Sequence, residues 1–216
     1  MDPRIHILEA NPPLRRFAAI LRKECEHSLQ RIKLLLKFKD VDIVLADDPR
    51  KVVKPLVIGG WTQNSHLVFV WLNSSHRYFA NRIRTEIGRT LAHELHHVAR
   101  WQLTGKYGRN LFEALVTEGL ADHFVLQVFD GKPEPWDIVL SHGALKRFII
   151  RARREFANRS YDHRAWFYGS QGRRIPKWTG YSLGFYVVAR YLEQHPRETP
   201  ARLVGASANK FFSAVK

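Results

Sequence analysis

The sequence predicts an α+β fold in which a small mixed or antiparallel sheet packs against helices. Three observations lead to this prediction: a helical spacing of apolar residues in 13–37, short runs typical of strands between residues 41 and 72, and long helical patterns after residue 78. With 216 residues, 45% of them hydrophobic, the chain is large enough for a sizeable core. No repeat or low-complexity linker divides it, so one domain over residues 1–216 is expected.

The first elements are an N-terminal helix and the sheet. Within residues 1–38, apolar side chains recur with helical spacing from 13 to about 37, which predicts an amphipathic helix over one face of a sheet. The sheet itself is expected within residues 41–72. Its strands are predicted at 41–45, 54–58 and 66–72, with a turn at 59–65.

Two long helices are predicted within residues 78–129. The first runs from 78 to 102, with Gly105 as its terminator, and the second from 111 to 129. Gly119 is costly inside the second helix, which indicates that another backbone approaches it closely. A C-terminal helical part, residues 137–216, is expected to follow. Its predicted helices span 141–158, 180–194 and 200–215.

The first long helix carries the segment His93-Glu94-Leu95-His96-His97, which has the residue types and spacing of a metal site. Histidines four residues apart project from one face of a helix, so both imidazoles can bind one ion. Glu94 lies on the same turn and can reach a water on that ion without binding the ion, as a general base requires. The segment therefore predicts a catalytic zinc site.

A third ligand must come from elsewhere, because catalytic zinc takes three protein ligands and keeps one position open for water. A glutamate on the second helix can supply it. Glu118 fits better than Glu113, because only Glu118 is followed one turn later by an aspartate, Asp122, that can accept a hydrogen bond from a metal-bound histidine. One Zn²⁺ per chain, bound by His93, His97 and Glu118, is expected.

Three motifs carry a resemblance to a known family: HELHH at 93–97, EGLAD at 118–122 and GYSLGF at 180–185. The first two resemble the pattern of gluzincins, the thermolysin-like zinc peptidases. All three are similar to the motifs of a bacterial family of predicted zinc-dependent proteases. The resemblance covers most of the chain from about Val41 onward. It implies a zincin-like fold in which the HExxH helix and a second, glutamate-bearing helix form the zinc core.

The resemblance also implies a role for each matching residue. His93, His97 and Glu118 are the implied metal ligands. Glu94 is the implied general base, and Asp122 is the implied partner of a metal-bound histidine. The implied activity is hydrolysis of peptide bonds in a peptide or protein substrate, with a zinc-activated water.

Two further roles are expected near this site. Tyr181, in the third motif, is the candidate donor for the oxyanion of the transition state, and a core tyrosine is the alternative. By resemblance to gluzincins, the strand at 66–72 is expected to pair with the substrate backbone, and an ordinary sheet strand is the alternative.

Other polar residues near the motifs receive other expectations. His96 is predicted to be a partly exposed helix residue. His123 is predicted to be structural. The irregular stretch 159–180 is expected to form a cleft wall or lid. The aromatic and basic residues singled out in it are His163, Tyr168 and Arg173.

The charge of the chain is the second informative feature. The net charge is +15, and residues 146–190 hold eleven Lys and Arg but only two acids. Such a bias indicates nucleic acid, an acidic protein or an anionic membrane as a partner, whereas a solvated basic face is the commoner explanation. The alternative to a protease is therefore a basic nucleic-acid-associated protein with a vestigial or regulatory metal site.

Composition also bears on location. No apolar run approaches the roughly 20 residues of a membrane span. The N-terminus has no signal pattern, and the single cysteine, Cys25, precludes an internal disulfide. A cytoplasmic location is expected.

Overall fold

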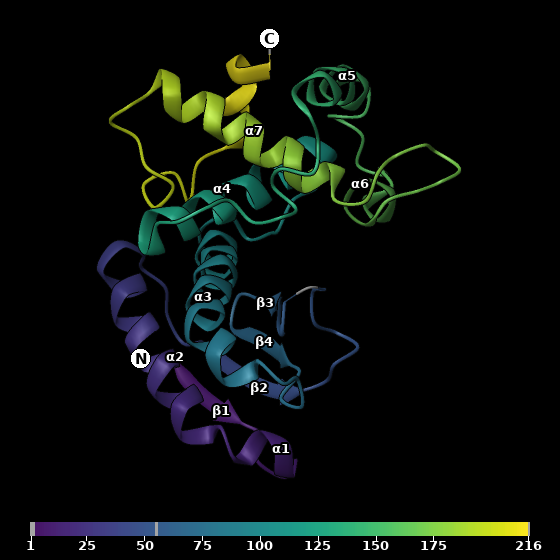
Figure 1. The fold of residues 1–216 in the computed structure, drawn as a ribbon. Helices are drawn as coiled ribbons and strands as arrows, with labels where there is room; N and C mark the ends of the chain where they lie inside the picture. The colour runs from purple at the N-terminus through teal and green to yellow at the C-terminus, as the bar shows by residue number, and fades with distance from the viewer. Residues whose placement is uncertain (1–2, 55, 216) are drawn as a thin grey trace. The chain divides into compact units, whose positions relative to one another are not determined.

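The computed structural model describes residues 3–54 and 56–215. It has the predicted α+β fold, with a four-stranded sheet and helices (Figure 1). The chain divides into two compact units, Met1–Gly105 and Lys106–Lys216. The sheet belongs to the first unit, and the second unit is mainly helical. The expectation of one domain over the whole chain stays a prediction.

The sheet of the first unit is mixed. Its strands are β1 (Arg4–Ile7), β2 (Asp42–Asp47), β3 (Ile58–Asn64) and β4 (Leu67–Leu72), in the spatial order β1-β2-β4-β3. β1, β2 and β4 are parallel, whereas β3 runs antiparallel to β4. Every second residue of β4 is buried, as expected for a strand with one face on the core.

The central position of β4 overturns one expectation. The main chain of β4 pairs with β2 along one edge and with β3 along the other. No edge of this strand is left for a substrate backbone, because β-augmentation needs an unpaired edge. The prediction that residues 66–72 pair with substrate is therefore wrong, and they form an ordinary sheet strand.

β3 occupies a segment that was predicted as a turn. The strand predicted at 54–58 is wrong, although residue 55 itself lies outside the described residues, and most of the predicted turn at 59–65 is strand. Gly59 and Gly60 give the segment the composition of a turn, but in β3 they allow other parts of the chain to lie close to the strand. A Cβ on Gly59 would lie 2.5 Å from the carbonyl oxygen of Lys51.

The helices of the first unit are α1 (Pro12–Arg15), α2 (Ala18–Leu35) and α3 (Phe79–Thr104). α1 and α2 replace the single helix predicted at 13–37. α3 ends at Gly105, whose φ of 72° is left-handed, so the predicted terminator is confirmed. α3 packs against β3 and β4, and α2 packs against α3 and β1 (Figure 1).

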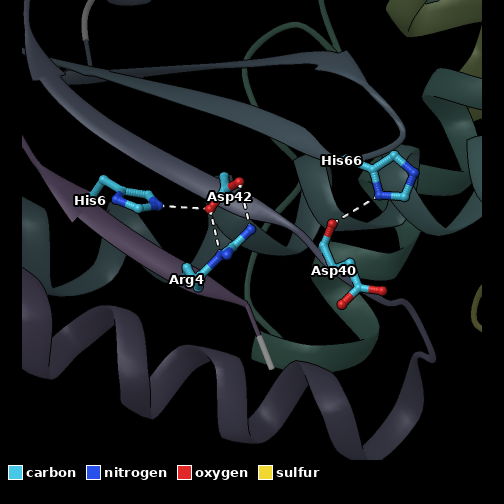
Figure 2. Close-up of polar contacts among 5 residues, drawn as sticks. All are labelled: Arg4, His6, Asp40, Asp42 and His66. Carbon is cyan, nitrogen blue, oxygen red and sulfur yellow. Dashed lines mark hydrogen bonds and ion pairs between the residues drawn. The ribbon is translucent and has the colours of Figure 1, made fainter. Parts of the chain in front are cut away.

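β1 was not predicted, and side chains help to hold it against β2. Asp42 accepts hydrogen bonds from Arg4 Nε (2.9 Å) and His6 Nε2 (2.7 Å) (Figure 2). The bond from His6, followed by those from Arg4, lowers the pKa of Asp42 despite the opposing effect of desolvation. Nearby, His66 Nδ1 lies 2.9 Å from the carbonyl oxygen of Asp40. Such cross-strand pairs lie far apart in sequence.

The second unit is built from α4 (Leu111–Phe129), α5 (His142–Arg153), α6 (His163–Tyr168), α7 (Thr179–Gln194) and the 3-10 helix η1 (Ala208–Val215). α4 has the predicted bounds, and α7 begins one residue early. α5 is shorter than the predicted 141–158, only the end of 200–215 is helical, and α6 was not predicted. Among the described residues, no helix combines the length and apolar character needed to cross a membrane.

α4 and α7 pack with their backbones in close contact at two glycines. A Cβ on Gly119 of α4 would overlap the carbonyl oxygen of Gly184 and lie 2.9 Å from Val188 Cγ2. A Cβ on Gly184 would overlap the carbonyl oxygen of Leu115. The expectation that Gly119 tolerates its helical cost because another backbone approaches is confirmed.

We expect Gly184→Ala to lower the free energy of unfolding by about 2 kcal/mol or more, because the added methyl meets rigid backbone. Urea unfolding followed by circular dichroism measures the change. Gly172→Ala is the matched control, since a Cβ there meets nothing within 4 Å. Equal stability of both variants would contradict the close packing of α4 and α7.

Candidate metal centre

α3 brings His93 and His97 together in the first unit. Their Nε2 atoms lie 3.0 Å apart, and their rings meet edge to face. Two nitrogens bound to one tetrahedral zinc at 2.0–2.1 Å would be separated by about 3.3 Å. The observed separation is within a few tenths of an ångström of that value. The two histidines therefore fit a shared metal ion.

Glu94 is held from two sides in the same unit. Its side chain is buried, and Thr62 of β3 donates its hydroxyl to Oε2 at 2.6 Å. The same hydroxyl lies 3.0 Å from the carbonyl oxygen of Glu94. Gly60 covers the carboxylate on another side, because a Cβ there would lie 2.6 Å from Glu94 Cγ. The edge strand β3 thus fixes the rotamer of the candidate base.

Glu118 lies on α4 in the second unit and is also buried. The hydroxyl of Tyr107 donates a hydrogen bond to Glu118 Oε1. Thr117 in turn donates its hydroxyl to the carbonyl oxygen of Tyr107 at 2.9 Å. Burial and then the charge of Glu118 raise the pKa of Tyr107 well above its usual value, so the phenol stays protonated and acts as donor.

Asp122 follows Glu118 by one helical turn and is almost fully buried. Trp136 Nε1 donates a hydrogen bond to its Oδ1 at 3.3 Å. The backbone of Trp136 is held as well, since Ser182 on α7 donates its hydroxyl to the Trp136 carbonyl oxygen at 2.7 Å. The carboxylates of Glu118 and Asp122 are therefore both oriented by neighbours within the second unit.

Glu113, the competing ligand, is engaged elsewhere. Its carboxylate pairs with Lys106 Nζ at 2.9 Å and accepts a hydrogen bond from the backbone N–H of Arg109 at 2.8 Å. Partial burial raises the pKa of Glu113, but the bonds from Lys106 and Arg109 outweigh it and the pKa is lowered. These contacts stabilise the start of α4, where Asn110 caps the helix.

A family model described as predicted Zn-dependent protease (DUF2268) matches residues 21–213. The chain belongs to this family. The family expected from the three sequence motifs is thereby confirmed. No curated protein and no solved structure is detectably similar to the chain.

His96 and His123, the two other histidines near the motifs, have surroundings typical of structural residues. The prediction that His96 is partly exposed is wrong, because α3 is buried without a break from Glu94 to Arg100. His123 lies with Nε2 3.0 Å from the carbonyl oxygen of Phe185, and its ring stacks on that of Phe185. Burial lowers the pKa of His123, which favours the neutral ring.

Tyr181 and the stretch 159–180 form an aromatic cluster. Tyr181 is partly buried against Phe167 and Trp136, an environment typical of a core tyrosine. His163 of α6 stacks on Phe167, and its Nδ1 lies 2.9 Å from the hydroxyl of Tyr161. Tyr168 is half exposed, and Arg173 pairs with Glu155 and Asp162. A role in a cleft wall or lid stays a prediction.

Sequence reasoning missed Thr62 and Tyr107. Thr62 fell within the predicted turn, and Tyr107 lies in a short loop between two helices without any motif. A correct assignment of β3 as a strand would have indicated that Thr62 belongs to the site. Gly60 and Thr62 are two residues apart, so their side-chain positions lie on the same face of a strand.

We expect Thr62→Val to lower the free energy of unfolding by about 1–3 kcal/mol, because the buried carboxylate of Glu94 loses its hydroxyl donor. Thr62→Ser keeps the hydroxyl and should stay close to wild type. Urea unfolding of the metal-free protein compares the three. Thr62→Val lacks the hydroxyl but keeps the methyl, and Thr62→Ser keeps the hydroxyl but lacks the methyl, so a valine variant as stable as the serine variant would contradict a stabilising hydrogen bond to Glu94.

Proposed function

We propose that this protein is a zinc-dependent peptidase that hydrolyses peptide bonds, with Glu94 as the general base. The observation that carries the proposal is the geometry on α3. His93 and His97 converge through their Nε2 atoms, while the intervening Glu94 is turned toward β3 and held there by Thr62. Membership in a family described as predicted Zn-dependent proteases supports it.

One Zn²⁺ per chain is held by His93, His97 and Glu118 in this proposal. Two imidazoles and one carboxylate are a common protein ligand set for catalytic zinc. The two imidazoles converge on α3 in the first unit, and the carboxylate is buried on α4 in the second. Tyr107, which donates to Glu118, orients the carboxylate ligand from outside.

These ligands would hold a zinc ion, which would lower the pKa of a bound water toward about 7 and polarise the scissile carbonyl. Glu94 takes the proton of the attacking water. Because Oε2 already accepts the hydroxyl of Thr62, the proton is taken at Oε1. The water oxygen bonds to the carbonyl carbon, the C–N bond breaks, and Glu94 returns the proton to the leaving amine.

The substrate in this proposal is a peptide or protein. Tyr181 is retained as the candidate donor to the developing oxyanion, because its hydroxyl is on a partly buried side chain near the start of α7. β3 replaces β4 as the candidate strand for pairing with the substrate backbone. It is an edge strand, and Gly60 and Thr62 bring it directly against Glu94.

We expect the protein purified without added metal to contain about one zinc per chain by mass spectrometry. Glu118→Gln should lose most of this zinc, because an amide is a much weaker zinc ligand than a carboxylate. Glu113→Gln is the matched control and should keep it, since Glu113 binds Lys106. Loss of zinc from Glu113→Gln alone would show that Glu113, and not Glu118, is the third ligand.

We expect Glu94→Gln to lower hydrolysis of fluorescein-labelled casein by about 10²-fold or more, because the amide cannot accept the proton. Its zinc content should remain that of wild type, since Glu94 is not a ligand in this proposal. Glu86→Gln, on the same helix, is the control and should keep the activity. Full activity in Glu94→Gln would exclude Glu94 as the base.

A further inference from the structure

The excess positive charge of the second unit comes from one segment. Residues 141–178 contain ten Lys and Arg and two acids. The rest of the unit, residues 106–140 and 179–216, contains eight basic and eight acidic residues. The charge is therefore localised, whereas a general solubilising surface would spread it over the whole unit.

The exposed face of α5 is basic. Lys146, Arg147, Arg153 and Arg154 are all exposed, and at 100° per residue they fall within about one third of the helix circumference. The buried side chains Ile149 and Ala152 lie on the other side, against the core of the second unit. α5 thus presents four cations to solvent around one exposed apolar side chain, that of Ile150.

Trp166 connects this helix to the following segments. Its ring has the guanidinium of Arg151 at 5.9 Å and that of Arg173 at 6.0 Å, and its Nε1 donates to Glu155 Oε2 at 3.1 Å. Arg173 also pairs with Glu155 and Asp162. Both acids of the segment are therefore paired locally, and the contacts of Trp166 and Arg173 join α6 and the loop after it to the end of α5.

We name the exposed cations of this segment the α5–α6 basic face, which is defined by eight residues. They are Lys146, Arg147, Arg153, Arg154, Arg159, Arg164, Arg174 and Lys177. Six of the eight are arginines. A guanidinium presents a planar fork of donors that matches a phosphate group in two hydrogen bonds, whereas an ammonium acts as a point charge.

We propose that the α5–α6 basic face binds the phosphate backbone of nucleic acid. A membrane surface fits less well, because an interfacial helix must turn a whole apolar side to the lipid. Ile150 is the one exposed large apolar side chain of α5, and its other apolar side chains pack against the core of the second unit. Tyr168, which is 50% exposed, adds an aromatic ring on which an unpaired base can stack. Binding is independent of base sequence, since the contacts are to phosphate.

The test is fluorescence anisotropy with labelled DNA of about 30 nucleotides, single-stranded and duplex, at about 50–200 mM salt. The full chain is compared with a variant that carries Lys146→Gln, Arg147→Gln, Arg153→Gln and Arg154→Gln. We expect this variant to lose at least about tenfold in affinity near 100 mM salt. The slope of log K against log[salt] should also become less negative, by the amount that corresponds to about three lost phosphate contacts.

The matched control removes the same charge from the first unit, through Arg16→Gln, Arg22→Gln, Lys23→Gln and Lys37→Gln. All four are exposed, and the affinity should change by less than about twofold. Glu94→Gln should bind like wild type, because the inference does not rest on the proposed activity. Circular dichroism melting confirms that each variant is folded.

Three outcomes would overturn the proposal. The first is no binding by wild type near 100 mM salt, and the second is equal loss in the two quadruple variants, which would assign binding to net charge alone. The third is binding to vesicles with about 30% phosphatidylserine but not to DNA, which would assign the face to an anionic membrane.

Discussion

The burial of three carboxylates is the constraint on which the organisation of the candidate metal centre depends. Glu94, Glu118 and Asp122 are each no more than 6% exposed. A buried carboxylate without partners costs several kcal/mol, so the surrounding fold has to supply donors. Thr62, Tyr107 and Trp136 supply them, one to each carboxylate. Each donor comes from outside the helix that carries its acceptor, so the helix packing and the orientation of the carboxylates are determined together.

Close approach of backbones is the second requirement, and glycine meets it in both units. Gly60 allows β3 to lie against Glu94, while Gly119 and Gly184 allow α4 and α7 to pack without intervening side chains. A helix such as α4, which is buried at nearly every position from Leu111 to Val125, cannot rely on an amphipathic pattern to select its neighbours. Backbone contact at the glycines gives α4 and α7 a defined register.

Local signals explain which parts of the fold could be predicted from the sequence. α4 has the expected bounds because Asn110 caps its start and Asp130 ends it with a positive φ, and α3 ends at Gly105 as expected. β1 was missed because it depends on pairing with the distant strand β2, and β3 was missed because its glycines gave the segment the composition of a turn. The buried state of His96 was missed for a similar reason. The pattern of apolar residues in a helix predicts which of its faces is buried. Burial of the remaining faces depends on other segments of the chain that pack against the helix.

The site was predictable to the extent that its residues follow helical spacing. His93 and His97, and likewise Glu118 and Asp122, are four residues apart, and this spacing alone places each pair on one helix face. Thr62 and Tyr107 lie on a strand and in a loop, where no periodicity relates them to the residues they contact.

The distribution of charge is a further property that the composition of the chain does not reveal. The first unit has 17 basic and 10 acidic residues, close to the 18 and 10 of the second. Net charge therefore does not distinguish the units. Only the structure shows that Trp166 links α6 to α5 and that the two acids of residues 141–178 are already paired. Within a Debye length of about 10 Å, such local density determines the attraction felt by a polyanion more than the total charge does.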